Sequence, residues 1–171
     1  MKKLSIITLI FLLSGCSSSG KKSIDKLYFR FPEATKNSID KKIEIKRPQA
    51  MGIIGNRPMV VLTKEGGLMQ MQHHFWLDSP KVLLQNYLED TLGKEDETNY
   101  VLSSTILNLE KDNNSAVVAI KFLLADKSGN TILNKTYKQQ TEINGESISD
   151  FAHTAQRLIN EIVAQLVDEI Q

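Results

Sequence analysis

The sequence predicts an α+β domain in which a largely antiparallel sheet of about six strands carries two helices on one face. Three observations predict this fold. Extended segments that alternate apolar and polar residues occur on both sides of a central helical segment. Two helical segments begin with residues that cap helix N-termini. The last three extended segments are joined by turns so short that only antiparallel pairing is open to them.

Four extended segments precede the first helix. They cover residues 27–31, 43–46, 58–63 and 68–76. Pro32 stops the first of them, and Gly66-Gly67 supplies the turn between the last two. The stretch Met51–Gly55 fits either a short strand or a loop, and both interpretations stay open.

The first helix is expected to begin at Ser79, the N-cap, with Pro80 at the first helical position, where its missing N–H costs nothing. Apolar residues then recur at helical spacing up to Leu92. Gly93 is a suitable residue to end the helix. The sequence therefore predicts a helix between these two signals.

Three more strands follow the first helix. They cover residues 100–110, 116–126 and 131–141. The turns between them are rich in Asp, Asn and Gly, which tolerate turn conformations. Four apolar residues of the middle strand alternate along one face, which places that strand centrally over the core. They are Val118, Ile120, Phe122 and Leu124.

The chain ends in a long amphipathic helix. Ser147 and Asp150 have the spacing of a capping box. An apolar stripe then repeats every three to four residues from Phe151 to Ile170. One interpretation packs the whole stripe on the sheet, and the other has so wide a stripe also serve a partner subunit.

Composition excludes several classes of function. The chain has 171 residues, with 21 Lys and Arg against 20 Asp and Glu, and one cysteine. A charge this balanced gives no polybasic surface, which argues against nucleic acid or anionic lipid headgroups as an electrostatic partner. A single cysteine excludes an intrachain disulfide and every multi-cysteine metal site.

We find no catalytic constellation and expect no enzyme. The Gly93-Lys94 pair lacks the hydroxyl residue and the leading glycine of a phosphate-binding loop. His73 and His74 are neighbours on a strand and would point to opposite faces, one buried and one exposed, so no metal site is expected. No Gly-x-Ser-x-Gly nucleophile motif occurs in the sequence.

The segment before the first helix is unusually rich in methionine. Met69, Met71, His73 and Phe75 share one face of the expected strand, and Trp76, the single tryptophan, follows them. Met-rich apolar surfaces recur at sites that accept varied partners. These residues either fill the core, or Met69, Met71, Phe75 and Trp76 contact a partner or a lipid.

The N-terminus resembles a lipoprotein signal peptide, expected over residues 1–15. Two lysines precede an apolar run, Leu4–Leu13, that is too short to cross a bilayer. The run ends in Leu13-Ser14-Gly15-Cys16, which resembles a bacterial lipobox. The alternative is an ordinary secretory leader followed by an unused thiol, although a free thiol outside the cytosol is a liability.

A lipobox implies lipidation of Cys16, which would carry a covalent diacylglycerol and an N-acyl chain. No other cofactor is expected. Several acyl chains make a durable membrane anchor. Residues 16–25 then form the lipidated cysteine and a flexible tether to the domain, residues 26–171. The stretch Ser17–Ser23 of this tether, fully extended, spans about 20–25 Å from the lipid. Ser17 stands where Asp would signal inner-membrane retention, which favours the outer membrane, facing the periplasm.

The sequence resembles the ABC-type transport auxiliary lipoprotein family, the lipoprotein component of MCE-type lipid transport systems. The resemblance spans about residues 28 to 92. The family commonly has an acidic residue in the stretch after the tryptophan, for which Asp78 stands in here, and a longer loop ahead of the tryptophan, which Gly66-Gly67 shortens. The segments that carry the resemblance are the lipobox at Cys16, Tyr28–Phe31, Ile43–Pro48, Arg57–Val61, Phe75-Trp76 and the helix that starts at Pro80.

The resemblance implies a non-catalytic accessory subunit. Its partners would be an MCE-domain lipid-transport protein with its permease and ATPase complex, which the lipoprotein docks at the outer membrane. A homo-oligomeric ring is also implied, because some relatives assemble in this way. The alternative function is an outer-membrane assembly or cell-wall regulator lipoprotein that binds another periplasmic partner.

Overall fold

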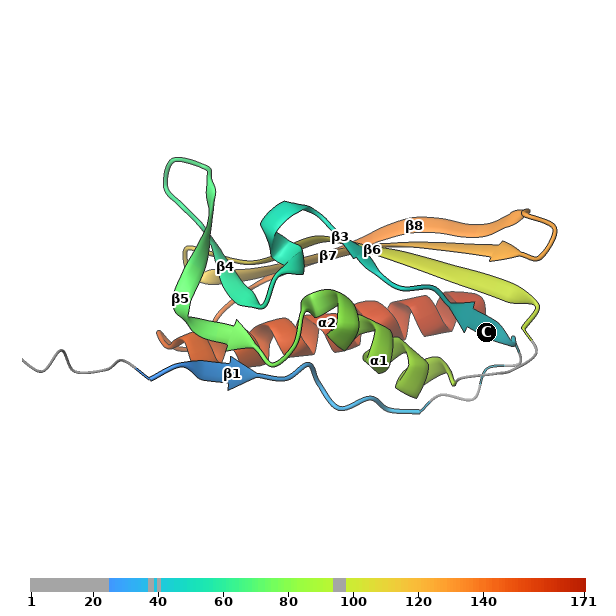
Figure 1. Ribbon diagram of the computed structural model, residues 1–171, viewed down its shortest axis with the longest axis horizontal. Helices are drawn as coiled ribbons and strands as arrows, with labels where there is room; N and C mark the ends of the chain where they lie inside the picture. The colour runs from blue at the N-terminus through green and yellow to red at the C-terminus, as the bar shows by residue number, and fades with distance from the viewer. Residues whose placement is uncertain (1–24, 37–38, 40, 94–97) are drawn as a thin grey trace, which may run out of the picture.

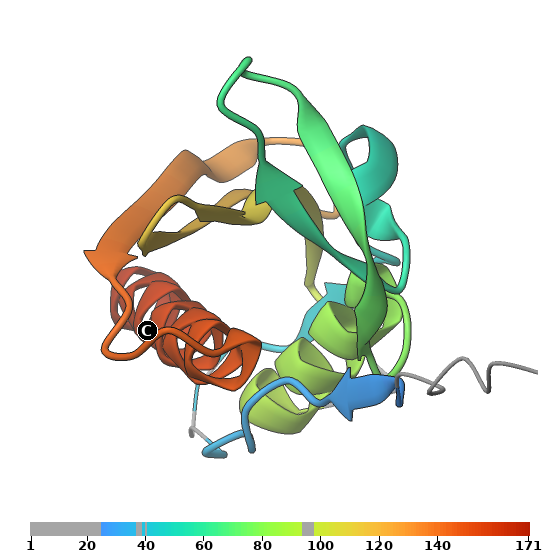
Figure 2. The ribbon, with the colours of Figure 1, turned by 90° about the vertical axis from the view of Figure 1, so that its left-hand side faces the viewer.

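The computed structural model describes residues 25–36, 39, 41–93 and 98–171. It is an α+β layer in which one curved sheet covers two helices (Figures 1 and 2). The expected signal peptide, Cys16 and nearly all of the tether lie outside the described residues.

The sheet has eight strands instead of about six. Its order is β1-β5-β4-β6-β7-β8, and β2 and β3 also pair with β6. The strands are β1 (Leu27–Phe29), β2 (Ile43–Ile45), β3 (Gln49–Ala50), β4 (Pro58–Leu62), β5 (Leu68–Trp76), β6 (Tyr100–Asp112), β7 (Ser115–Asp126) and β8 (Thr131–Glu142). Most of these segments coincide with the expected ones.

The sheet is mixed, so the expectation of a largely antiparallel sheet is wrong. The neighbours β4–β5, β6–β7 and β7–β8 are antiparallel, as short turns require. However, β1 runs parallel to β5, and β2, β3 and β4 run parallel to β6. These parallel partners are separated in the chain by long connections, such as the β5–α1 passage between β4 and β6, and such connections permit parallel pairing.

Both helices form where the capping residues predict them. They are α1 (Pro80–Leu92) and α2 (Ile148–Ile170), and Figure 2 shows them on the same side of the sheet. The Ser79 hydroxyl accepts from the Val82 amide. The Asp150 amide donates to Ser147 Oγ at 3.1 Å, and the Ser147 amide donates to Asp150 Oδ2 at 3.0 Å, which confirms the capping box. No helix among the described residues has both the length and the hydropathy to span a membrane.

The core lies between the sheet and the helices. On β7 the four alternating residues from Val118 to Leu124 are at most 1% exposed, which confirms the central position expected for that strand. The apolar stripe of α2 is at most 3% exposed from Phe151 to Ile170. The whole stripe is therefore buried by packing within the chain, so the interpretation that it also serves a partner subunit is wrong.

Residues Gly52–Gly55 form a short 3-10 helix, η2, so neither the strand nor the loop expected here is present. The Ile54 amide donates to the Met51 carbonyl at 3.1 Å, and the Asn56 amide donates to the Ile53 carbonyl at 3.1 Å. Gly52 has a φ of 48°, which favours glycine at this position. Gln70 on β5 donates to the Ile53 carbonyl at 3.5 Å and ties η2 to the sheet.

Candidate functional site

Strand β1 is the described element that follows the predicted lipid anchor most directly in the chain. Cys16 lies outside the described residues, and the described chain begins at Asp25, two residues before β1. In Figure 1, β1 lies at the edge of the molecule. Any constraint that the anchor imposes reaches the folded domain through this strand.

Trp76 is a core residue, which corrects its proposed role as a surface contact. Its side chain is 1% exposed. Its ring meets Phe31 edge to face, with ring centroids 5.3 Å apart. The Trp76 amide donates to the Arg57 carbonyl at 2.7 Å, so the backbone is also fixed.

The other three candidate contact residues on β5 have different surroundings. Met69 is 56% exposed, Met71 is half-buried against the core and Phe75 is half-buried. Met71 and Trp76 both pack on the core although they are five positions apart, an odd offset that would place them on opposite faces of a regular strand, so the strand changes face between them. The pairing with β4 is irregular in this region, between Pro58 and Val60. A uniform strand face was therefore the wrong expectation.

Phe75 belongs to a surface cluster that we call the β1–β5 aromatic cluster, made of Lys26, Tyr28, Arg57 and Phe75. The rings of Tyr28 and Phe75 are stacked, with centroids 5.4 Å apart and planes at 27°. Lys26 Nζ lies 5.6 Å from the centre of the Phe75 ring, and the Arg57 guanidinium lies 5.4 Å from that of Tyr28. Each ring therefore carries a cation at cation–π distance.

The parallel pairing of β1 with β5 brings this cluster together, because it sets Tyr28 opposite Phe75. Sequence reasoning found Phe75 but missed Lys26, Tyr28 and Arg57 as its neighbours. Lys26 and Tyr28 lie at β1, Arg57 lies just ahead of β4 and Phe75 lies on β5, and only the position of the edge strand β1 joins them. The alternation Lys26-x-Tyr28 was the one local signal, and it does not reveal a partner strand.

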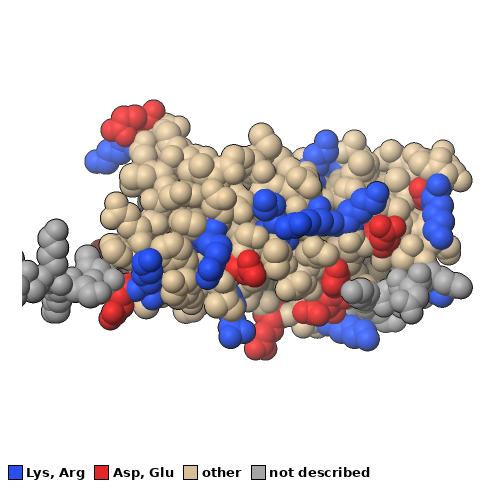
Figure 3. Space-filling model, viewed as in Figure 1, with Lys and Arg blue, Asp and Glu red and all other residues tan. Residues whose placement is uncertain are grey.

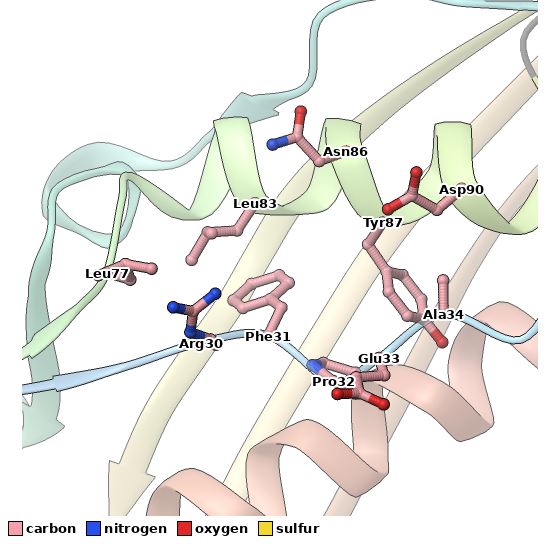
Figure 4. Close-up of a pocket in the computed structure, with 10 residues that line it drawn as sticks. All are labelled: Arg30, Phe31, Pro32, Glu33, Ala34, Leu77, Leu83, Asn86, Tyr87 and Asp90. Carbon is pink, nitrogen blue, oxygen red and sulfur yellow. The ribbon is translucent and has the colours of Figure 1, made fainter.

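An open groove lies between α1 and the segment that follows β1 (Figure 4). It has a volume of about 520 Å³. Phe31, Leu83 and Tyr87 supply apolar walls, while Arg30 and Asp90 stand among the lining residues as opposite charges. Its lining of apolar surface and mixed charge has no arrangement of nucleophile, base and orienting acid.

The groove is held in shape by contacts to both helices. Gln156 on α2 donates to the Arg30 carbonyl at 2.8 Å. The Tyr87 hydroxyl on α1 donates to Asn160 on α2. Burial raises the pKa of Tyr87, so the phenol stays protonated and remains a donor at neutral pH. Sequence reasoning missed this groove, since packing of distant segments creates it.

A buried carboxylate, Glu110, lies on the sheet face away from the helices. It pairs with Val60 on β4 and Val117 on β7, and it is 5% exposed. Asn108 donates to Glu110 Oε1 at 2.6 Å, and the Leu109 amide donates to Oε2 at 2.8 Å. Burial raises the pKa of Glu110, and these two hydrogen bonds oppose the rise.

The two adjacent histidines, His73 and His74, are both half-buried, so the expectation of one buried and one exposed ring is wrong. Burial lowers the pKa of His74, and the neighbouring His73 lowers it further. Across the part of the chain that the structure describes, no group of three or more His, Cys, Asp or Glu residues is placed to hold a metal ion.

Solved structures share this arrangement of sheet and helices. A protein from Xanthomonas campestris assigned to the family DUF330 matches with a TM-score of 0.72 and 13% identity, over 82% of this chain and 92% of that one. The chain shares its fold with this DUF330 protein. An uncharacterized protein matches with a TM-score of 0.76 and 11% identity, over 86% of this chain and 100% of that one.

Identities this low show the fold alone. They bear out the α+β architecture with its two helices and carry no function to this chain. No protein-family model matches the sequence, and no curated protein matches it either.

Proposed function

We propose that this chain is a non-catalytic, membrane-anchored accessory subunit of an MCE/ABC-type lipid transport system. It docks the periplasmic conduit at the outer membrane and supports envelope integrity. The observation that carries the proposal is the Leu13-Ser14-Gly15-Cys16 sequence, which resembles a lipobox and stands just ahead of the folded domain. A chain anchored there acts within a short distance of one membrane surface.

The segments that resemble the auxiliary lipoprotein family support the proposal. They span residues 28 to 92, which correspond to β1 through α1 in the structure. Within this unit Trp76 is fully packed against Phe31, directly ahead of the Ser79 cap of α1. The aromatic residue before the helix therefore has a structural reason, since it fixes the edge of the sheet to the start of α1.

The surfaces of the domain suit a subunit that holds a partner in place. The groove beside α1 is lined in part by Arg30 and Phe31, from the segment that follows β1. A partner bound in the groove would be kept close to the lipid by the tether. A subunit of this kind needs no catalytic residues, because the permease and ATPase supply the energy.

Affinity capture from native membranes after mild crosslinking tests the proposal. We expect an MCE-domain protein to co-purify with the full-length lipoprotein. The matched control is Cys16→Ala, which removes the anchor and should greatly reduce that capture. Recovery of the lipoprotein alone would contradict the proposal, and recovery of an outer-membrane assembly factor or a peptidoglycan synthase would support the alternative function. Genes for a permease and an ATPase beside this gene would be a second, independent support.

A further inference from the structure

We propose that the β1–β5 aromatic cluster is a membrane-contact surface, which binds the anionic phospholipid headgroups of the membrane that anchors the domain. The inference rests on the proposed function in one respect, the lipid anchor at Cys16. It adds an orientation: one particular edge of the domain faces the bilayer, and the remaining surface is left to protein partners.

The length of the chain outside the structure brings this edge to the membrane. Eight residues separate Cys16 from Asp25, and even fully extended they reach only about 30 Å. Lys26 and Tyr28 follow immediately. Strand β1 is the first in the strand order, so no described strand of the sheet lies beyond it to keep this edge from the lipid.

The chemistry of the cluster matches the interface of a bilayer. Tyr28 is 49% exposed and its neighbour Leu27 is 47% exposed, so aromatic and aliphatic surface faces solvent beside two cations. Amphipathic aromatic rings favour the headgroup layer, and Lys and Arg side chains are attracted to anionic headgroups. Together they combine the two attractions that hold peripheral proteins to membranes.

The two cations lie beside rings, and among the described residues neither forms an ion pair with a carboxylate. The ion pairs found among the described residues join Lys135 to Glu169 and Arg157 to Glu161, and neither involves the cluster. Arg57 donates from Nε to the Trp76 carbonyl at 3.5 Å, which orients its guanidinium over Tyr28. A cation held over a ring in this way remains able to meet a phosphate.

The charges beside β1 favour contact with an anionic surface over contact with a neutral one. The chain as a whole has balanced charge, but at the β1–β5 aromatic cluster two cations, Lys26 and Arg57, stand beside one acid, Asp25. Figure 3 shows Lys and Arg side chains, with Asp and Glu side chains near them, around the end of the molecule where β1 lies, and largely uncharged surface between there and the charged tip of the β4–β5 hairpin. This combination, at the point where the tether enters, fits a phospholipid surface better than a protein partner.

The experiment uses the full-length, lipidated protein reconstituted into vesicles. A thiol-reactive fluorophore is attached at Leu27→Cys within the exposed edge, or at Ser128→Cys in the exposed turn between β7 and β8 as the matched control. Vesicles of phosphatidylcholine, with or without phosphatidylglycerol, carry a doxyl-labelled lipid that quenches fluorophores at the headgroup level. Co-flotation of the protein with the vesicles is measured in the same samples and reports the anchor separately.

We expect the fluorophore at residue 27 to be quenched several-fold more than the one at residue 128 on vesicles with phosphatidylglycerol. The double charge reversal Lys26→Glu with Arg57→Glu should reduce quenching at residue 27 to the level of the control position, while Lys127→Glu, a matched reversal in the turn between β7 and β8, should leave it unchanged. High salt should act like the double reversal, because it screens the headgroup attraction.

Three results would overturn the inference. Protein that floats with the vesicles but shows equal quenching at both positions has an anchor but no membrane-contact surface at β1. Protein that does not float has no anchor at Cys16, and then both the membrane-contact surface and the support for the proposed function are lost. Quenching at residue 27 that persists without phosphatidylglycerol and after the double reversal would show that the cations play no part.

Discussion

Phe31 meets Trp76 edge to face, with ring centroids 5.3 Å apart and planes at 84°. Phe31 lies in the segment that leaves β1, and Trp76 ends β5. The two side chains are 9% and 1% exposed. This contact holds the segment after β1 against the core of the domain. A pull on the predicted anchor would therefore be resisted by two packed aromatic side chains.

Trp76→Ala is expected to lower the free energy of unfolding by about 3–5 kcal/mol, because it removes a fully buried aromatic side chain. Circular dichroism during urea unfolding measures the change. Met69→Ala, at an exposed position of the same strand, should alter stability by no more than about 0.5 kcal/mol. If the alanine variant fails to fold, Trp76→Phe should retain the fold at reduced stability. An unchanged unfolding midpoint in both variants would show that the ring is not part of the core.

Tyr87→Phe is expected to lower the free energy of unfolding by about 1 kcal/mol, the usual net value of one hydrogen bond. The lost bond joins the Tyr87 hydroxyl on α1 to Asn160 on α2. Asn160→Ala should cost a similar amount, and the double variant should cost less than the sum of the two because both changes remove the same bond. Asn86→Ala, at an exposed position on α1, is the control, and full additivity would contradict the bond.

Glu110→Gln is expected to change how stability depends on pH. Burial raises the pKa of the Glu110 carboxyl in the folded protein, so the folded state holds its proton more tightly than the unfolded chain does. The contribution of Glu110 to stability is therefore greatest below the unfolded pKa and is lost as the pH rises through the raised folded value. Removing the carboxyl removes that loss.

The measurement for Glu110 is the difference in unfolding free energy between the wild type and Glu110→Gln from pH 4 to pH 8. The difference isolates this group from Asp126, Asp150 and Glu169, whose lowered pKa values act in the opposite direction. The variant should gain stability relative to the wild type as the pH rises. A difference that stays constant with pH would contradict a raised pKa.

Sequence reasoning succeeded where the signal is local. The Ser79 cap with Pro80 and the Ser147–Asp150 capping box placed both helices, because capping depends on residues a few positions apart. The three strands after α1 were found because alternation and short turns fix antiparallel neighbours. These features need no knowledge of the rest of the chain.

The parts that sequence reasoning missed depend on distant contacts. The short strands β1, β2 and β3 pair in parallel with partners far along the chain, and nothing in three residues specifies such a partner. In β6 an extra residue between Ile106 and Asn108 reverses the alternation, so that Ile106 and Leu109 both face the core. That reversal turns Glu110 to the other face, which a regular alternation cannot anticipate.

The candidate contact residues show the same division. Met69 and Phe75 were singled out for their composition, and both reach the surface in part. Trp76 was singled out with them and is buried, since β5 changes face before it. The cations that complete the β1–β5 aromatic cluster, Lys26 and Arg57, became visible only once β1 was placed beside β5.

Lipidation of Cys16 is the most direct test of the proposed membrane anchoring. Cells expressing the wild type or Cys16→Ala are labelled with radioactive palmitate, and the membranes are separated from the soluble fraction. We expect the wild type to incorporate label and to remain with the outer membrane, and Cys16→Ala to be unlabelled and released with its domain still folded. A wild-type protein that carries no palmitate and is recovered in the soluble fraction would contradict the proposed membrane anchoring.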